Sequence, residues 1–115
     1  MIPESYQDLP GSTALAHVAT IGPKGEPQSN PVWFHWDGEH VRFSQTKTRQ
    51  KYRNLNRDPR IALSIVDPDD PFRYLEIRGA VERIEEDADL AFNHRPGDER
   101  VVVLVRPERT TKMGS

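Results

Sequence analysis

Apolar and polar residues alternate along most of this chain, and the alternation predicts a protein made mainly of β-strands. Strands are expected over residues 14–21, 28–36, 40–45, 60–66, 73–84 and 100–106. One short helix, beginning after residue 47 and ending near residue 58, is expected between the third and fourth strands. The pattern therefore predicts a mainly β fold, a small six-stranded antiparallel barrel crossed by one helix.

Glycine, proline and aspartate residues mark the expected turns and irregularities. The pair Asp37-Gly38 is typical of a two-residue type I′ hairpin. Pro31 cannot donate a backbone hydrogen bond, so we expect an edge strand or a bulge around it. Gly79 predicts a bend at a barrel corner, and Pro107 is expected to end the last strand.

Length and composition favour one soluble domain over residues 1–115. With 35% hydrophobic residues and no cysteine, the chain has no disulfide framework, thiolate metal site or thiol nucleophile. A chain of this size builds a deep cleft with difficulty unless a second subunit helps, which points to a dimer. Neither a leader nor a membrane-spanning stretch is recognisable, so we expect a cytoplasmic protein without a membrane partner.

The positive charge is concentrated in one place. Residues 47–60 hold six basic residues and one acidic residue, a charge of +5 in a chain whose net charge is −2. Thr48 is the expected N-cap of the helix, next to Lys47, Arg49 and Lys51. A helix N-terminus with added cations suits a phosphate, so we interpret this segment as an anion site. The alternative is an ordinary solvated surface helix.

Residues that carry acid–base, nucleophilic or metal chemistry are not arranged for it. The four histidines, at positions 17, 35, 40 and 94, lack ligand-like spacing, so no metal site is expected. No nucleophile elbow or glycine-rich phosphate loop occurs. Adjacent carboxylates fall in a predicted turn and at a predicted helix start over residues 85–92, where acidic residues are common. The sequence therefore assigns no catalytic residue.

Aromatic residues near the second strand suggest what else the anion site meets. Phe34 and Trp36 are expected in the core, whereas Trp33 lies on the opposite face beside Pro31 and is expected to meet a planar ligand or a partner subunit. Backbone amides near Asn30, Pro31 and Val32 should be free to line a ligand. Single-stranded nucleic acid binding is the competing class, but it needs a longer positive stripe, and we expect no nucleic-acid partner.

Several segments together resemble a known family. They are ATIGPKGEPQSNPVWF at 19–34, Phe43-Ser44, KYRNLNRDPRIAL at 51–63, RGAVE around Gly79, and VRPER at 105–109. This pattern is similar to the pyridoxamine 5′-phosphate oxidase-like split β-barrel proteins that bind FMN, and most similar to their flavin/deazaflavin oxidoreductases that use coenzyme F420. Between Phe92 and Asn93 the chain lacks a longer helical segment that family members usually carry.

The resemblance implies a homodimer with a cofactor in a groove at each subunit interface. The cofactor phosphate would meet Ser44, Lys47, Thr48, Arg49 and Lys51. The ring would lie along Gln28, Ser29, Asn30, Pro31, Val32 and Trp33. The implied function is an F420-dependent oxidoreductase that passes a hydride to a small electron-poor substrate. FMN in place of F420, and a carrier or sensor without turnover, stay open as alternatives.

Overall fold

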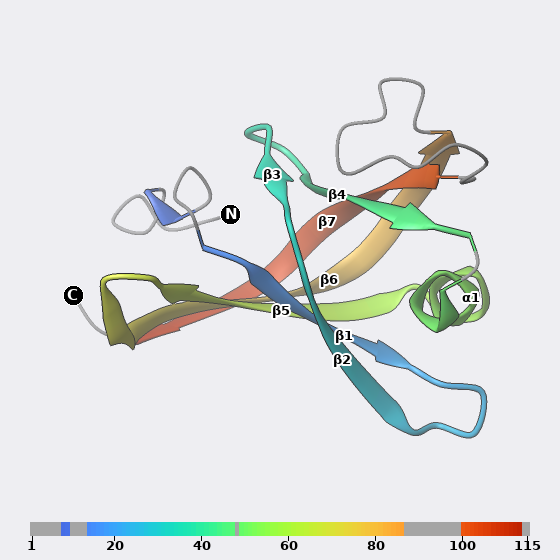
Figure 1. Cartoon of the computed structure of the whole chain (residues 1–115), viewed down its shortest axis with the longest axis horizontal. Helices are drawn as coiled ribbons and strands as arrows, with labels where there is room; N and C mark the ends of the chain where they lie inside the picture. Colours follow the sequence, from blue (N-terminus) through green and yellow to red (C-terminus); the bar gives the residue numbers. More distant parts are fainter. Residues whose placement is uncertain (1–7, 10–13, 48, 87–99, 114–115) are drawn as a thin grey trace.

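A curved antiparallel sheet and one helix make up the described part of the protein (Figure 1). The computed structural model describes residues 8–9, 14–47, 49–86 and 100–113. The strands are β1 (Ala16–Ile21), β2 (Pro27–Val32), β3 (His35–Trp36), β4 (Val41–Thr46), β5 (Arg60–Asp67), β6 (Asp70–Glu86) and β7 (Arg100–Met113). The helix is α1 (Gln50–Arg57). The sheet order is β2-β1-β5-β6-β7-β4-β3, and every neighbouring pair is antiparallel.

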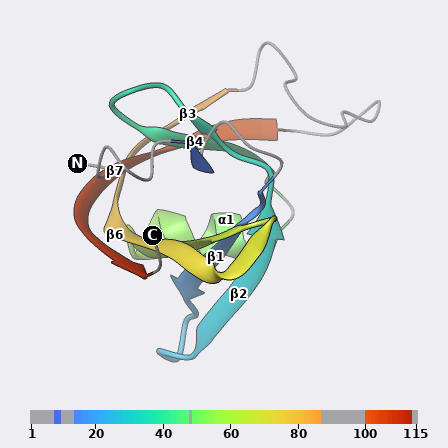
Figure 2. The same cartoon turned by 90° about the vertical axis from the view of Figure 1, so that its left-hand side faces the viewer.

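The strands curl around an apolar interior, and α1 lies across the space that they surround (Figure 2). Side chains on the inner face alternate with exposed ones, as period-two strands require. The most deeply buried large side chains are Leu9, Val18, Val41, Phe43, Leu63, Ile65, Leu75, Ile77, Val101, Val103 and Val105. This arrangement confirms the predicted mainly β class and the split-barrel fold.

The sheet has seven strands where six were predicted, because the expected strand over 28–36 divides in two. β2 pairs with β1 at one edge of the sheet, whereas β3 pairs with β4 at the other edge. Trp33 and Phe34 carry the chain from one edge to the other, so they cannot stay in either ladder. β2 is an edge strand, as Pro31 predicted, and Pro27 gives it a second proline.

Gly79 forms the predicted bend in β6. The register against β7 shifts between Arg78 and Gly79, and Gly79 stands opposite Pro107. A Cβ atom at residue 79 would overlap the carbonyl oxygen of Arg106, so only glycine allows the two strands to approach this closely. The prediction that Pro107 ends the last strand is wrong. β7 continues to Met113 because the proline lies at the register shift, where a missing N–H disturbs the ladder least.

The β3–β4 connection is longer than the predicted two-residue turn. Trp36 pairs with Val41, so four residues form the loop. The Asp37 Oδ1 atom accepts hydrogen bonds from the backbone N–H groups of Glu39 at 2.9 Å and His40 at 2.6 Å. This side-chain turn replaces the type I′ geometry, and Gly38 supplies the positive φ of 95° that the loop needs.

α1 begins one residue later than predicted. Its N-cap is Arg49, without a side-chain capping bond, while the expected N-cap Thr48 lies outside the described residues. The helix ends at Arg57 as predicted, and the backbone N–H of Asp58 donates to the Asn54 carbonyl at 2.8 Å. Leu55 is buried in the core.

Two predictions fall wholly or partly on residues that are not described. The acidic helix expected over 85–92 is wrong at its start, because Glu85 and Glu86 extend β6 and pair with β7. Its remainder, and the junction of Phe92 with Asn93, lie outside the described residues. No helix among the described ranges is long and apolar enough to cross a membrane.

Near the chain start, Leu9 is buried in the core, and Asp8 accepts hydrogen bonds from the buried Arg73 side chain at 2.7 and 2.9 Å. Asp67 accepts a third hydrogen bond from the same guanidinium at 2.9 Å. These bonds join the described part of the N-terminal segment to the first part of β6.

Candidate functional site

A cavity of about 480 Å³ lies between β2, the end of β4, the start of α1 and the start of β7. Volumes of this size are typical of small-molecule sites. The cavity is lined by Gln28, Asn30, Pro31, Val32, Trp33, Ser44, Gln45, Thr46, Arg49, Gln50, Lys51 and Arg100. These residues come from four separate elements, and sheet curvature brings them together.

Lys51 is the buried cation of this cavity. Its side chain lies in the first turn of α1 and is only 5% exposed, with Nζ 5.8 Å from the centre of the Phe43 ring. Within the described part of the chain, the ammonium makes no ion pair or hydrogen bond. Burial, and secondarily the positive charge of Arg49, lower the pKa of Lys51 from 10.5 to about 8. An anion placed in the cavity would relieve both effects.

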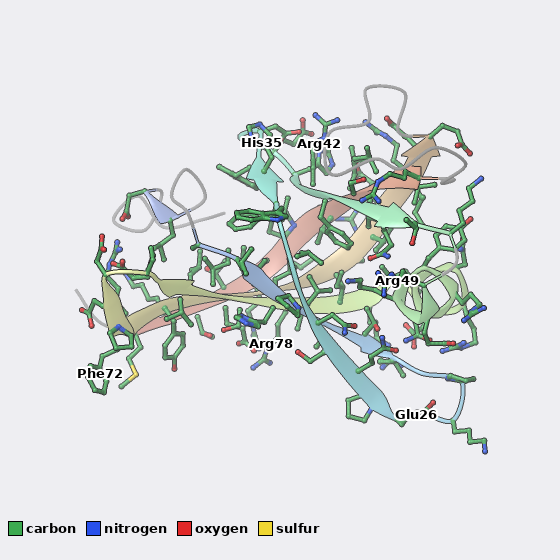
Figure 3. All side chains as sticks on the ribbon, in the orientation of Figure 1. Glu26, His35, Arg42, Arg49, Phe72 and Arg78 are labelled. Carbon is green, nitrogen blue, oxygen red and sulfur yellow. The ribbon has the colours of Figure 1, made fainter. Side chains whose placement is uncertain are left out.

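Arg100 supplies a third cation from another direction. Its Nε atom donates to the Ser44 hydroxyl oxygen at 3.0 Å, and the pairing of Thr46 with Arg100 brings β7 beside β4. Figure 3 places Arg49 at the start of α1, so the cavity has cations on its helix and its strand side. The described lining contains three cations and no carboxylate, which suits a ligand with more than one negative charge.

The β2 wall is fixed to the helix by buried amides. Asn54 is fully buried in α1, and its Nδ2 atom donates to Thr20 Oγ1 at 3.0 Å and to Gln28 Oε1 at 3.2 Å. Next to this polar stretch, Val32 is half-buried, and Trp33 is 53% exposed. This wall thus offers side-chain amides at one end and an indole face at the other, which suits a planar ring with polar edges.

The cavity brings together most of the residues that were predicted to bind a cofactor. Those that line it are Gln28, Asn30, Pro31, Val32, Trp33, Ser44, Arg49 and Lys51. Ser29 is exposed and does not line it, and Lys47 forms an ion pair with Glu86 at 2.9 Å. Thr48 lies outside the described residues. Binding by all of these residues stays a prediction.

Sequence reasoning did not single out Gln45, Thr46, Gln50 or Arg100, although all four line the cavity. Gln50 directly follows Arg49 at the predicted basic helix start, so its place in the sequence could have indicated that it belongs to the site. Among the described residues, no group of three or more His, Cys, Asp and Glu side chains lies together as metal ligands would.

The lowered pKa of Lys51 leads to a prediction for the protein without any ligand. Between pH 8 and 10.5 the unfolded chain holds a proton on Lys51 that the folded chain has lost. The free energy of unfolding should therefore rise with pH across this interval by an amount that is absent in Lys51→Met. Urea unfolding of both proteins from pH 7.5 to 10.5 measures the difference. If the free energy of unfolding changed with pH in the same way for both proteins, the burial of a charged Lys51 would be contradicted.

A protein family and a solved structure each match nearly the whole chain. The family described as pyridoxamine 5′-phosphate oxidase matches residues 2–114. The solved structure of an F420 reductase is 42% identical, with a TM-score of 0.85, and the alignment covers 96% of this chain and 98% of that chain.

More distant structures share the fold alone. The conserved hypothetical protein Rv2991 from Mycobacterium tuberculosis is 23% identical, with a TM-score of 0.77, over 98% of this chain and 85% of that chain. A putative pyridoxamine 5′-phosphate oxidase from Lactobacillus delbrueckii is 22% identical, with a TM-score of 0.76, over 96% of this chain and 93% of that chain.

Proposed function

Because this chain belongs to the pyridoxamine 5′-phosphate oxidase family, we propose that it is an oxidoreductase that binds coenzyme F420. In this proposal it transfers a hydride between the reduced cofactor and a small electron-poor organic substrate. The similarity to an F420 reductase over almost the full length of both chains supports this choice of cofactor. The observation that carries the proposal is the buried Lys51 in a cavity lined by cations.

The cavity fits the phosphate of such a cofactor on chemical grounds. A buried ammonium without a counterion is unfavourable, and an anionic oxygen beside it forms a short, charge-assisted hydrogen bond. Arg49 and Arg100 line the same space from the helix and from β7, and so does Ser44 of β4, whose hydroxyl accepts a hydrogen bond from Arg100. We assign phosphate binding to Lys51, Arg49, Arg100 and Ser44.

The ring is assigned to the other wall. Pro31, Val32 and Trp33 provide its apolar surface, while Gln28 and Asn30 provide amide groups for its polar edge. The cofactor, when bound, supplies the hydride chemistry. The chain's own residues orient the ring, and the described lining contains no carboxylate to act as an acid or base. A catalytic residue is therefore not assigned.

A second copy of the chain is part of the proposal. Trp33 lines the cavity and is still half exposed, so the single chain leaves the ring wall open to solvent. We propose a homodimer in which the partner covers this opening. Light scattering after size-exclusion chromatography should give the mass of two chains. The mass of one chain at micromolar concentration would contradict this part of the proposal.

Titration with F420 and with FMN, followed by absorption and fluorescence, tests the choice of cofactor. Tighter binding of F420 is expected, and preferential FMN binding would favour the flavin alternative. Mixing the reduced complex with quinones or conjugated enones then tests turnover, since oxidation of the cofactor identifies an enzyme. Binding without turnover would favour a carrier or sensor. Binding to neither cofactor, with tight binding to single-stranded RNA, would overturn the proposal.

A further inference from the structure

A chain of side-chain amides runs from α1 to the cavity. Gln50 Nε2 donates to Asn54 Oδ1 at 2.8 Å, and Asn54 Nδ2 donates to Gln28 Oε1 at 3.2 Å and to Thr20 Oγ1 at 3.0 Å. Gln28 Nε2 then donates to Asn30 Oδ1 at 2.8 Å. Three of these amides, those of Gln50, Gln28 and Asn30, line the cavity, whereas Asn54 is fully buried behind them.

This chain has a direction. A carboxamide accepts at its oxygen and donates at its nitrogen, so each link fixes the orientation of the next amide. Because the Asn54 oxygen is used by Gln50, its nitrogen serves Gln28. Gln28 therefore turns its own nitrogen toward the Asn30 oxygen. At the end of the chain, the Asn30 Nδ2 group is left as a hydrogen-bond donor at the cavity wall.

Burial makes the direction hard to reverse. Asn54 has no exposed surface, and all of its polar atoms are engaged within the protein. Turning this amide over would set its nitrogen against the Gln50 nitrogen and its oxygen against the Gln28 oxygen, and Asn54 itself has no exposed surface at which water could replace the lost bonds. Gln28 and Asn30, which are only half-buried, follow the orientation that Asn54 sets.

We propose that Asn54, acting through Gln28, holds the Asn30 amide with its N–H group toward the cavity, where it recognises a hydrogen-bond acceptor on the ligand. This inference rests on the proposed function and deepens it, since the acceptor would be a carbonyl oxygen at the edge of the cofactor ring. A ligand that presents an N–H or amino group at this position is selected against. Asn30 is thus a specificity residue, and Asn54 is a positioning residue that touches no ligand.

A double-mutant cycle tests the relay. F420 affinity is measured by fluorescence titration for wild type, Asn54→Leu, Asn30→Ala and the double variant. Each single change should weaken binding about fivefold to tenfold, the value of one hydrogen bond. The double variant should lose clearly less affinity than the two single losses would give if they added, because Asn54 acts on Asn30 through Gln28. Thr20→Val, which leaves the Asn54–Gln28 bond in place, is the control and should keep its affinity.

The outcomes separate the relay from the proposed function. Losses that add in the double variant would overturn the relay, because Asn54 would then have a merely structural effect. Unchanged affinity of Asn30→Ala would overturn it too. If wild type binds neither F420 nor FMN, the proposed function itself fails. Thermal unfolding checks that each variant is folded, and Asn54→Ser takes the place of the leucine variant in the same cycle if leucine prevents folding.

Discussion

Replacing Lys51 with methionine is expected to weaken F420 binding about 10-fold to 100-fold, the value of a hydrogen bond between charged groups. The same change should leave the protein folded and at least as stable as wild type. Lys51 is almost fully buried, its pKa is lowered by burial and by Arg49, and it has no counterion among the described residues. Methionine keeps the buried stem and removes the desolvated charge, so the two effects have opposite signs.

Titration with F420 and thermal unfolding measure the two effects of Lys51→Met. Arg53→Met is the matched control, because Arg53 is an exposed cation of the same helix that does not line the cavity. An equal loss of affinity in both variants would mean that net charge, rather than a contact with Lys51, attracts the ligand. Alanine is the poorer choice at residue 51, since the structure shows that the lysine stem is packed and its removal would leave a void.

Replacing Gly79 with alanine is expected to destabilise the fold by more than about 3 kcal/mol, or to prevent folding. The added Cβ would overlap the Arg106 carbonyl oxygen and come within 3.3 Å of the Pro107 Cα atom. Both are backbone atoms of the paired strand β7, so the clash cannot be relieved by moving a side chain. Relief requires separating β6 from β7 at the point where the sheet bends.

Gly25→Ala provides the control for the Gly79 substitution. Gly25 has a φ of 82°, and nothing lies within 4 Å of an added Cβ, so only the conformational cost of about 1–2 kcal/mol is expected. Chemical denaturation of both variants compares the costs. Similar losses of stability in the two variants would show that β6 and β7 have room to separate. That result would contradict the close approach of the two strands at Gly79.

Local patterns were sufficient to predict most of the fold. Alternation along 60–66 and 73–84 predicted β5 and the central part of β6, and Asp58-Pro59 predicted where α1 ends. The division into β2 and β3 was not predictable, because nothing local to Trp33 and Phe34 says that the chain must leave one sheet edge for the other. β7 passes Pro107 because the partner strand has a register shift there, which is also a tertiary effect.

The candidate site, like the fold, has one part that local sequence predicts and another part that depends on tertiary structure. The cations at the start of α1 are close together in sequence, so a cationic wall at this place was predictable from charge alone, and anion binding there stays a prediction. The burial of Lys51 depends on packing beside Phe43, and the local charge pattern gives no indication of it. Arg100 lies 56 residues from Ser44, and only the pairing of β4 with β7 brings them together.

The two prolines of β2 have a consequence for how the molecule behaves at high concentration. Antiparallel partners alternate between hydrogen-bonded and non-bonded pairs, and Pro27 and Pro31 can occupy only the non-bonded class, which they share with Ser29. Along the outward side of this strand, the backbone therefore offers a single N–H group, that of Ser29. A strand from another molecule would find too few donors to add itself in register. The protein can thus leave this edge uncovered beside its cavity without seeding aggregation.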